Sequence, residues 1–277
     1  MEKILLGQTR IEVSRLGLGT VKFGRNEGVK YPQYFDLPTD YELTRLLSTA
    51  KELGINFLDT APAYGSSEER LGNLLKGARD QWIVMSKAGE EFERGRSSYD
   101  FSPDHIVKSL ERSLRRLQTD YLDIFLIHSN GDDMNILSDQ KLISKLYDLK
   151  KNGMIRMIGA STKTAQGGLM ALELLDVVMA EYNQFYQDER GVLDRALALG
   201  KPVILKKTMA SGHLDKFGSE DPVQTAMDFA FAHPGAAAAI VGTLSPERLR
   251  QNAAAADLAA RRSGNLQALT AASRGST

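Results

Sequence analysis

Short apolar runs alternate with longer amphipathic segments along nearly the whole chain. The short runs have the length of buried strands and span residues 16–19, 56–59, 82–87, 122–128, 157–161, 177–181, 203–206 and 238–241. The longer segments carry apolar residues three or four apart, which predicts helices over 41–53, 68–76, 103–117, 140–151, 165–174, 191–199, 222–232 and 246–256. The pattern therefore predicts an α/β protein in which strands and helices alternate.

Helix boundaries carry their own signals. Ser102 and Ser245 each precede a proline, which places an N-cap beside a residue suited to the first helical position. Gly54, Gly153 and Gly200 follow predicted helices, where a left-handed C-terminal cap favours glycine. These signals support the predicted order of elements.

Eight alternations in 277 residues match a parallel (β/α)8 TIM barrel, whose usual length is about 250 residues. A doubly wound open sheet is the alternative, but residues 17–24 read GLGTVKFG and lack the GxGxxG turn. Residues 1–14 are expected to form a hairpin that caps the lower end of the barrel. We expect a single domain over 1–277, with a polar, disordered tail at 263–277.

Composition excludes several classes of protein. The chain has 42% hydrophobic residues, which suits a packed core, and no cysteine, which excludes thiol nucleophiles, iron–sulfur clusters and disulfide scaffolds. Its 35 basic and 35 acidic residues leave no overall charge that favours nucleic acid. No apolar stretch is long enough for a signal peptide or a membrane span, so we expect a cytoplasmic protein.

Chemically distinctive residues occur at successive predicted strand ends, where a (β/α)8 barrel carries its functional groups. The second strand ends on Asp59, with Tyr64 in the following loop, the third ends on Lys87 and the fourth on His128. Each residue also has a purely structural explanation. Asp59 can cap a turn and Tyr64 can pack its ring, while Lys87 can be a solvated ammonium and His128 a hydrogen-bonded imidazole. Their joint occurrence favours a common site, because a lysine among apolar residues needs a carboxylate partner.

Such a group suits proton delivery to a carbonyl oxygen. A tyrosine is a weak acid near neutral pH, and we expect the Lys87 ammonium, held by Asp59, to make the Tyr64 proton easier to give. Neutral His128 is expected to orient the substrate oxygen. None of these residues is a hydride source or a metal site, so a bound cofactor must supply the reducing equivalent.

Residues 54–72, GINFLDTAPAYGSSEERLG, resemble the first signature of the aldo-keto reductase family. The resemblance continues through residues 85–87 (MSK), 121–128 (YLDIFLIH), 158–161 (IGAS), 181–183 (EYN) and 241–243 (VGT), with Arg248 and Asn252, and covers about residues 4 to 256. It implies that Asp59, Tyr64, Lys87 and His128 are a catalytic tetrad with Tyr64 as the general acid.

The resemblance also implies a nicotinamide cofactor, NADPH or less often NADH, extended over the barrel mouth. It places Gly19, Thr20, Val21, Asp59 and Ser161 beside the nicotinamide and ribose, with Thr162, Met179 and Lys206 at neighbouring positions. It places Met209, Ala210, Gly212 and Leu214 at the pyrophosphate, and Thr243, Ser245, Arg248, Gln251 and Asn252 at the adenosine end.

The chain departs from the family pattern at four positions. Thr162 stands where many members have asparagine, and Met179 stands where many have a glutamine that holds the carboxamide. Lys206 stands where many members stack a tyrosine on the nicotinamide, and its stem is expected to cover the ring while its ammonium meets a phosphate. Gly242 replaces a lysine that some members aim at the 2′-phosphate, which leaves Arg248 for that charge.

The substrate is expected to be a small carbonyl compound. Tyr31, Tyr34 and Phe35 in the first loop either wall its pocket or pack on the barrel rim. Two alternatives to a reductase remain: a Schiff-base lyase using Lys87 or Lys206, and a nucleotide-binding regulatory subunit without turnover. The resemblance implies a monomer, and we expect no metal, nucleic-acid or membrane partner.

Overall fold

Within residues 1–274, the part of the chain that this computed structural model describes, eight parallel strands close into a barrel. The strands are β3 (Leu16–Gly19), β4 (Phe57–Asp59), β5 (Ile83–Ala88), β8 (Leu122–His128), β9 (Ile155–Ser161), β10 (Val177–Glu181), β11 (Val203–Lys206) and β12 (Ala236–Val241). Strand β12 pairs with β3 and completes the circle. The predicted barrel is confirmed, and the doubly wound alternative is excluded.

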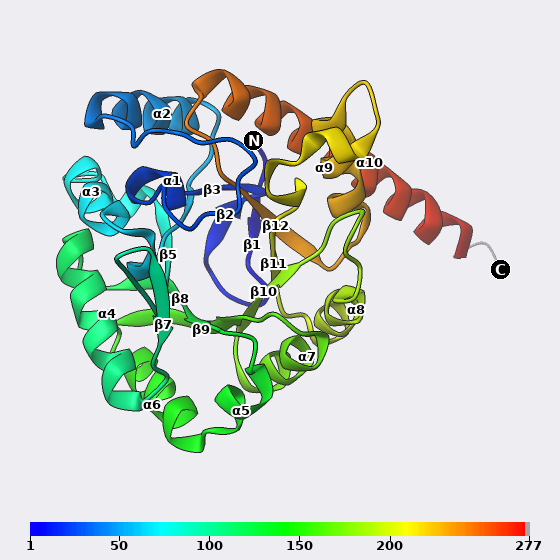
Figure 1. Cartoon of the computed structure of the whole chain (residues 1–277). Coiled ribbons are helices and arrows are strands. Elements are labelled where there is room, and N and C mark those ends of the chain that lie inside the picture. Colours follow the sequence, from blue (N-terminus) through cyan, green and yellow to red (C-terminus); the bar gives the residue numbers. More distant parts are fainter. Residues whose placement is uncertain (275–277) are drawn as a thin grey trace.

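Helices form a ring outside the strands, as Figure 1 shows. Each barrel strand is followed by a ring helix: α2 (Asp40–Glu52), α3 (Ser67–Leu74), α4 (Pro103–Leu117), α6 (Gln140–Lys151), α7 (Ala165–Leu174), α8 (Arg190–Leu199), α9 (Pro222–Ala232) and α10 (Pro246–Arg274). The Ser102 and Ser245 hydroxyls accept bonds from the third residue of their helices, at 3.3 and 3.2 Å, so both predicted caps are confirmed. Gly54, Gly153 and Gly200 have the expected positive φ.

Apolar side chains fill two layers. The inner layer lies inside the barrel and includes Phe57, Met85 and Ile124, each fully enclosed. The outer layer lies between the strands and the helices and includes Phe125 and Ile127 of the same strand as Ile124. Burial of one such side chain contributes about 2 kcal/mol, so the two layers together supply the main stabilisation of the fold.

The N-terminal hairpin closes the end of the barrel where the strands begin. Strands β1 (Lys3–Leu5) and β2 (Glu12–Ser14) pair antiparallel. Leu6, Ile11 and Val13 join the inner apolar layer with Phe57. The opposite end, where the strands finish, is left for the site.

Several elements differ from the sequence prediction. A second hairpin, β6 (Glu90–Glu93) with β7 (Arg96–Tyr99), follows β5. Its strands are too short and too polar to show the alternation of apolar and polar residues that predicts a strand. Helix α10 continues to Arg274, into the segment expected to be a polar tail, and residues 275–277 lie outside the described part of the chain. Short elements α1 (Val21–Gly24), α5 (Asp133–Ser138), η1 (Pro62–Tyr64), η2 (Arg79–Gln81), η3 (Ala210–Gly212) and η4 (Leu214–Phe217) were also not predicted.

Candidate active site

Alternation along the strands decides which side chains reach the centre of the barrel mouth. In β5, Met85 belongs to the inner layer and Val84 to the outer one, so Lys87, two residues beyond Met85, lies on the inner side. The same two-residue step places the last inward side chains of the other strands: Asp59 after Phe57, His128 after Leu126, Ser161 after Gly159, Glu181 after Met179 and Lys206 after Ile204. Polar groups thus form a final layer over an apolar interior.

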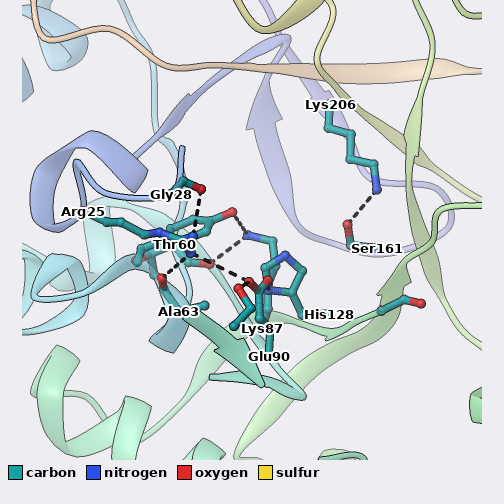
Figure 2. Close-up of polar contacts among 12 residues, drawn as sticks. Arg25, Gly28, Thr60, Ala63, Lys87, Glu90, His128, Ser161 and Lys206 are labelled. Atoms are coloured by element: carbon teal, nitrogen blue, oxygen red, sulfur yellow. Dashed lines mark hydrogen bonds and ion pairs between the residues drawn. The ribbon is translucent and has the colours of Figure 1, made fainter. Parts of the chain in front are cut away.

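Contacts of Lys87 and Tyr64 link the four residues predicted as catalytic. Its ammonium contacts the Asp59 carboxylate, donates to the Thr60 carbonyl at 2.9 Å and lies 3.1 Å from the Tyr64 hydroxyl (Figure 2). The Tyr64 and His128 rings meet edge to face, with centroids 6.1 Å apart. The four side chains are therefore brought together, as the sequence predicted.

Close backbone packing fixes the turn that carries Tyr64. Helix α1 ends on Gly24, and η1 ends on Tyr64 directly before Gly65. Gly65 has φ +62°, and a Cβ there would lie 2.1 Å from the Gly24 carbonyl oxygen. The two backbone segments can come this close only because residues 24 and 65 are both glycine. Their contact holds Tyr64 over Lys87.

Burial and neighbouring carboxylates raise the pKa of Tyr64 well above its usual value. Loss of solvent is the largest cause, followed by the charges of Asp59 and Glu90, while the charge of Arg25 acts in the opposite direction. The net direction is opposite to the one expected from Lys87. Burial also raises the pKa of Asp59, against the opposing effect of Lys87. Tyr64 is thus held in its protonated form, which is the form a proton donor requires.

His128 is held neutral for similar reasons. Burial lowers the pKa of its imidazole well below 6.5, and the positive charges of Lys87, Lys206, Lys163 and Arg25 lower it further. The lowered pKa agrees with the expectation that the His128 ring is neutral.

A cavity of about 1210 Å³ lies over this group and extends toward the start of α10. The four tetrad residues all line it. So do most of the residues predicted to bind the cofactor: Gly19, Val21, Ser161, Met179, Lys206, Met209, Gly212, Leu214, Thr243, Ser245, Arg248, Gln251 and Asn252. The structure therefore gathers residues from most of the barrel loops around one space.

Three predicted cofactor residues do not line the cavity. The buried hydroxyl of Thr20 donates to the Asp59 carbonyl and accepts from Ser67, at 2.9 and 2.8 Å, so it supports the strand ends. Thr162 is fully buried and offers its carbonyl oxygen to Lys206. Ala210 lies in η3 behind its lining neighbours. The side chains of these three residues do not face the cavity.

Lys206 lies beside Ser161, apart from Lys87 and His128, as Figure 2 shows. Its ammonium donates to the Ser161 hydroxyl at 3.0 Å and to the Thr162 carbonyl. Burial lowers the pKa of Lys206 to about 8, with the nearby Glu189 carboxylate opposing that shift, while burial raises the pKa of Glu189 to about 7. The ammonium therefore occupies the place beside Ser161, where the sequence resemblance had set the nicotinamide carboxamide.

The first loop crosses the mouth between α1 and the later loops. Tyr31 packs edge to face on Phe35, and the Lys22 ammonium lies 4.0 Å from the centre of the Tyr31 ring. Tyr34 is 79% exposed, although all three predicted aromatic residues touch the cavity. A Cβ on Gly242 would lie 2.9 Å from the Tyr31 hydroxyl, so a long side chain at 242 conflicts with this loop.

Positive charge gathers at the far end of the cavity. Arg248 lies in the first turn of α10, where the helix dipole favours an anion. Burial lowers the pKa of Lys22, and the charge of Arg248 lowers it further, so the two cations are close neighbours. Lys22 was not predicted, because a lysine in a short unpredicted helix has no distinguishing pattern.

Two further residues were missed on the catalytic side. Glu90 stands two residues beyond the end of β5, with its carboxylate 3.1 Å from Nδ1 of His128. Arg25 lies 3.7 Å from Glu90 and donates to the Ala63 carbonyl at 3.0 Å (Figure 2). An acidic residue directly after a barrel strand was the available signal for Glu90, but it lay in a hairpin that was not recognised.

Neither a metal site nor a membrane-spanning helix is present among the described residues. Over that part of the chain no cluster of histidine, aspartate or glutamate has metal-binding geometry. Among the helices described, none is both long and apolar enough to cross a membrane.

Comparison with known proteins identifies the family. The sequence model described as the aldo/keto reductase family matches residues 15–223, which is most of the chain. The chain belongs to the aldo-keto reductase family. Its Asp59, Tyr64, Lys87 and His128 lie inside the matched range.

Solved structures agree with this aldo-keto reductase fold. A crystal structure from Pseudomonas aeruginosa assigned to the aldo-keto reductases is 46% identical, with a TM-score of 0.85 over 93% of this chain and 95% of that one. The holo form of a Bacillus halodurans aldo-keto reductase is 26% identical, with a TM-score of 0.78 over 92% and 90% of the two chains.

Curated relatives of this aldo-keto reductase are oxidoreductases. The uncharacterized Bacillus subtilis oxidoreductase YqkF is 26% identical over 93% of this chain and 92% of its own length. The NADH-specific methylglyoxal reductase of Escherichia coli is 34% identical over 71% of this chain, which spans 61% of that enzyme. The protein is an NAD(P)H-dependent oxidoreductase, so the lyase and regulatory alternatives are not supported.

Proposed function

We propose that this enzyme reduces an aldehyde or ketone to the alcohol, with NADPH as the preferred cofactor and Tyr64 as the proton donor. The observation that carries the proposal is the contact of the Tyr64 hydroxyl with Lys87, 3.1 Å away, at the mouth of the cavity. A protonated phenol in that position meets the requirement for a general acid.

The charges around the cavity fit a dinucleotide with several phosphates. Lys22 and Arg248 flank the end at α10, and Lys206 and Lys207 line the middle. When bound there, a nicotinamide cofactor supplies the hydride that carbonyl reduction needs. Arg248 is the residue proposed to hold a 2′-phosphate, since guanidinium and phosphate pair well.

Each tetrad residue has a defined part in the proposed reaction. Tyr64 gives its proton to the substrate oxygen as the carbonyl carbon receives hydride, so one C–H and one O–H bond form. Lys87 stabilises the phenolate that remains, and Asp59 holds the Lys87 ammonium in place. His128 lies beside Tyr64 and positions the substrate against it.

The substrate is proposed to be small. Two relatives are named for small carbonyl or sugar substrates: the methylglyoxal reductase of Escherichia coli and the L-galactose dehydrogenase of Arabidopsis thaliana, which is 35% identical over 56% of this chain. Tyr31 and Phe35 pack together over the cavity and restrict the space near Tyr64. A compact aldehyde or ketone fits this arrangement.

The experiment that tests the proposal compares the wild type with Tyr64→Phe. Purified protein is titrated with NADPH and NADH by fluorescence, and turnover is followed by nicotinamide absorbance with a panel of small aldehydes. Loss of the proton donor is expected to lower kcat by about 10²-fold or more, while nucleotide affinity stays within a few fold. Near-normal turnover in the variant would show that another group is the acid. Tyr41→Phe, an exposed change on α2, is the control.

A further inference from the structure

Lys206 brings a positive charge to the barrel mouth without a carboxylate at hydrogen-bond distance. Its ammonium donates to the Ser161 hydroxyl at 3.0 Å and to the Thr162 carbonyl (Figure 2). Both acceptors are uncharged, and among the described residues no aspartate or glutamate forms an ion pair with this ammonium. A lysine has three N–H donors, so one donor is left for a ligand in the cavity that Lys206 lines.

The order of the strands sets this ammonium beside the catalytic group. Lys206 ends β11 and Ser161 ends β9, so the side chain spans the end of β10, which lies between those two strands. In the register of β8 and β9, Ser161 stands opposite His128. The ring of His128 in turn meets the ring of Tyr64. The ammonium therefore lies at the end of the cavity where the proposed reaction takes place.

The charge of Lys206 acts on two members of the tetrad. Burial lowers the pKa of His128, and the charges of Lys87 and then Lys206 lower it further. Burial raises the pKa of Asp59, and the charges of Lys87 and Lys206 oppose that shift. Lys87 itself contacts the Asp59 carboxylate, which offsets its charge. Lys206 has no such partner, so its charge acts across the mouth.

The carboxylates around Lys206 offset its charge only in part. The neighbouring Lys207 contacts the Glu181 carboxylate, so these two residues compensate one another. The strongest opposing charge comes from Glu189, directly before α8, which accepts from the Glu181 backbone N–H at 3.2 Å. Burial raises the pKa of Glu189 to about 7, so this carboxyl is only partly ionised near neutral pH. Lys206 therefore keeps a net positive charge toward the cavity.

The two redox forms of a nicotinamide cofactor differ in charge only at the ring. The ring is neutral in NADPH and carries one positive charge in NADP⁺, whereas their phosphates are identical. A cation that contacts a phosphate therefore adds equally to the affinity for both forms. Hydride transfer needs the ring at about 3–3.5 Å from the carbonyl carbon, whose oxygen lies at Tyr64. The ring must then lie at the catalytic end of the cavity, which is the end that holds Lys206.

We infer that Lys206 makes this site select the reduced cofactor, because its ammonium repels the positive charge that the nicotinamide ring carries only in the oxidised form. The inference rests on the proposed function and extends it to the direction of the reaction. Uptake of NADPH and release of NADP⁺ are both favoured, so the charge of Lys206 suits reduction of the carbonyl over oxidation of the alcohol.

Calorimetric titration with NADPH and with NADP⁺ at pH 7 tests the inference, because it needs no turnover. The wild type is expected to bind NADPH about fivefold or more tightly than NADP⁺. Lys206→Met and Lys206→Gln are each expected to lower that ratio of Kd values about fivefold. The glutamine amide can still donate to Ser161 or Thr162, so this variant separates loss of the charge from loss of the link between strands. An unchanged ratio in both variants would overturn the inference.

Arg248 supplies the matched control, because it lies at the other end of the same cavity. Arg248→Ala is expected to weaken NADPH and NADP⁺ by the same factor and to keep the wild-type ratio. A ratio that falls as far in Arg248→Ala as in Lys206→Met would show that the total charge of the cavity sets the preference. That result would contradict a specific role for Lys206.

The same titrations separate failure of the inference from failure of the proposed function. Binding of both forms with a ratio that does not depend on Lys206 would overturn the inference alone. Absence of binding for NADPH, NADP⁺, NADH and NAD⁺ would overturn the proposed function and the inference with it. A ratio that depends on Lys206, in a protein that reduces none of the small aldehydes, would support the inference while the proposed substrate class fails.

Discussion

The ammonium of Lys87 lies 3.1 Å from the Tyr64 hydroxyl, and the same nitrogen contacts the Asp59 carboxylate and the Thr60 carbonyl. The Lys87 side chain is 1% exposed, so these partners solvate its ammonium where water cannot reach it. The pair with Asp59 therefore supports both the stability of the barrel mouth and the position of Tyr64.

Breaking this buried pair is expected to destabilise the protein. Asp59→Asn leaves the Lys87 ammonium buried without a counter-charge, which should lower the free energy of unfolding by about 3 kcal/mol. The double variant Asp59→Asn with Lys87→Met removes both charges and should regain part of the loss. Urea unfolding of both variants measures the effect. A double variant that is no more stable than Asp59→Asn would contradict this coupling between the two charges.

Arg248 is expected to decide between NADPH and NADH. Arg248→Ala removes the guanidinium proposed to hold the 2′-phosphate, so the Kd for NADPH should rise about tenfold or more while that for NADH changes little. Equal losses for the two cofactors would rule out this role. Arg250→Ala is the matched control, because Arg250 lies on the same helix and pairs with Glu52 at 2.9 Å on the surface.

Lys206 is expected to make nucleotide binding depend on pH. Burial lowers its pKa to about 8, so its attraction for an anionic ligand is present below that pH and is lost as pH rises through it. Fluorescence titrations from pH 7 to 9.5 should show several-fold weaker binding at the upper end for the wild type. Lys206→Met should remove this inflection, whereas Lys207→Met should keep it and move it to higher pH, because the Lys207 charge helps to lower the pKa of Lys206. If the inflection in nucleotide affinity persists in Lys206→Met, another group causes the pH dependence.

Gly65 is expected to tolerate no side chain. Gly65→Ala combines a positive φ with a Cβ 2.1 Å from the Gly24 carbonyl oxygen, so it should cost about 2 kcal/mol or more and displace Tyr64. Gly77→Ala isolates the backbone cost, because Gly77 has φ +77° with nothing within 4 Å of an added Cβ, and should cost about 1 kcal/mol. Thermal unfolding and turnover are measured for both. Similar losses would mean that the contact with Gly24 relaxes at no cost.

The amino-acid sequence determined the barrel, because hydrophobic periodicity is a local property of each segment. The positions of Asp59, Lys87 and His128 at strand ends followed from the same pattern, and the GINFLDTAPAYG segment placed Tyr64 among them. The helix caps predicted at Ser102 and Ser245 are also confirmed, because each cap involves residues only three apart in the sequence.

Only the tertiary structure decided what surrounds these residues. The pKa of Tyr64 rises because burial and the charges of Asp59 and Glu90 act together, and both depend on how distant segments pack. Glu90 reaches the site from an unpredicted hairpin, Lys22 from the short helix α1 and Arg25 from the position directly after it. These short polar segments carry no periodicity that fixes the direction of their side chains. A strand pattern fixes which side chains point inward, but distances between separate loops are set by the closure of the whole barrel.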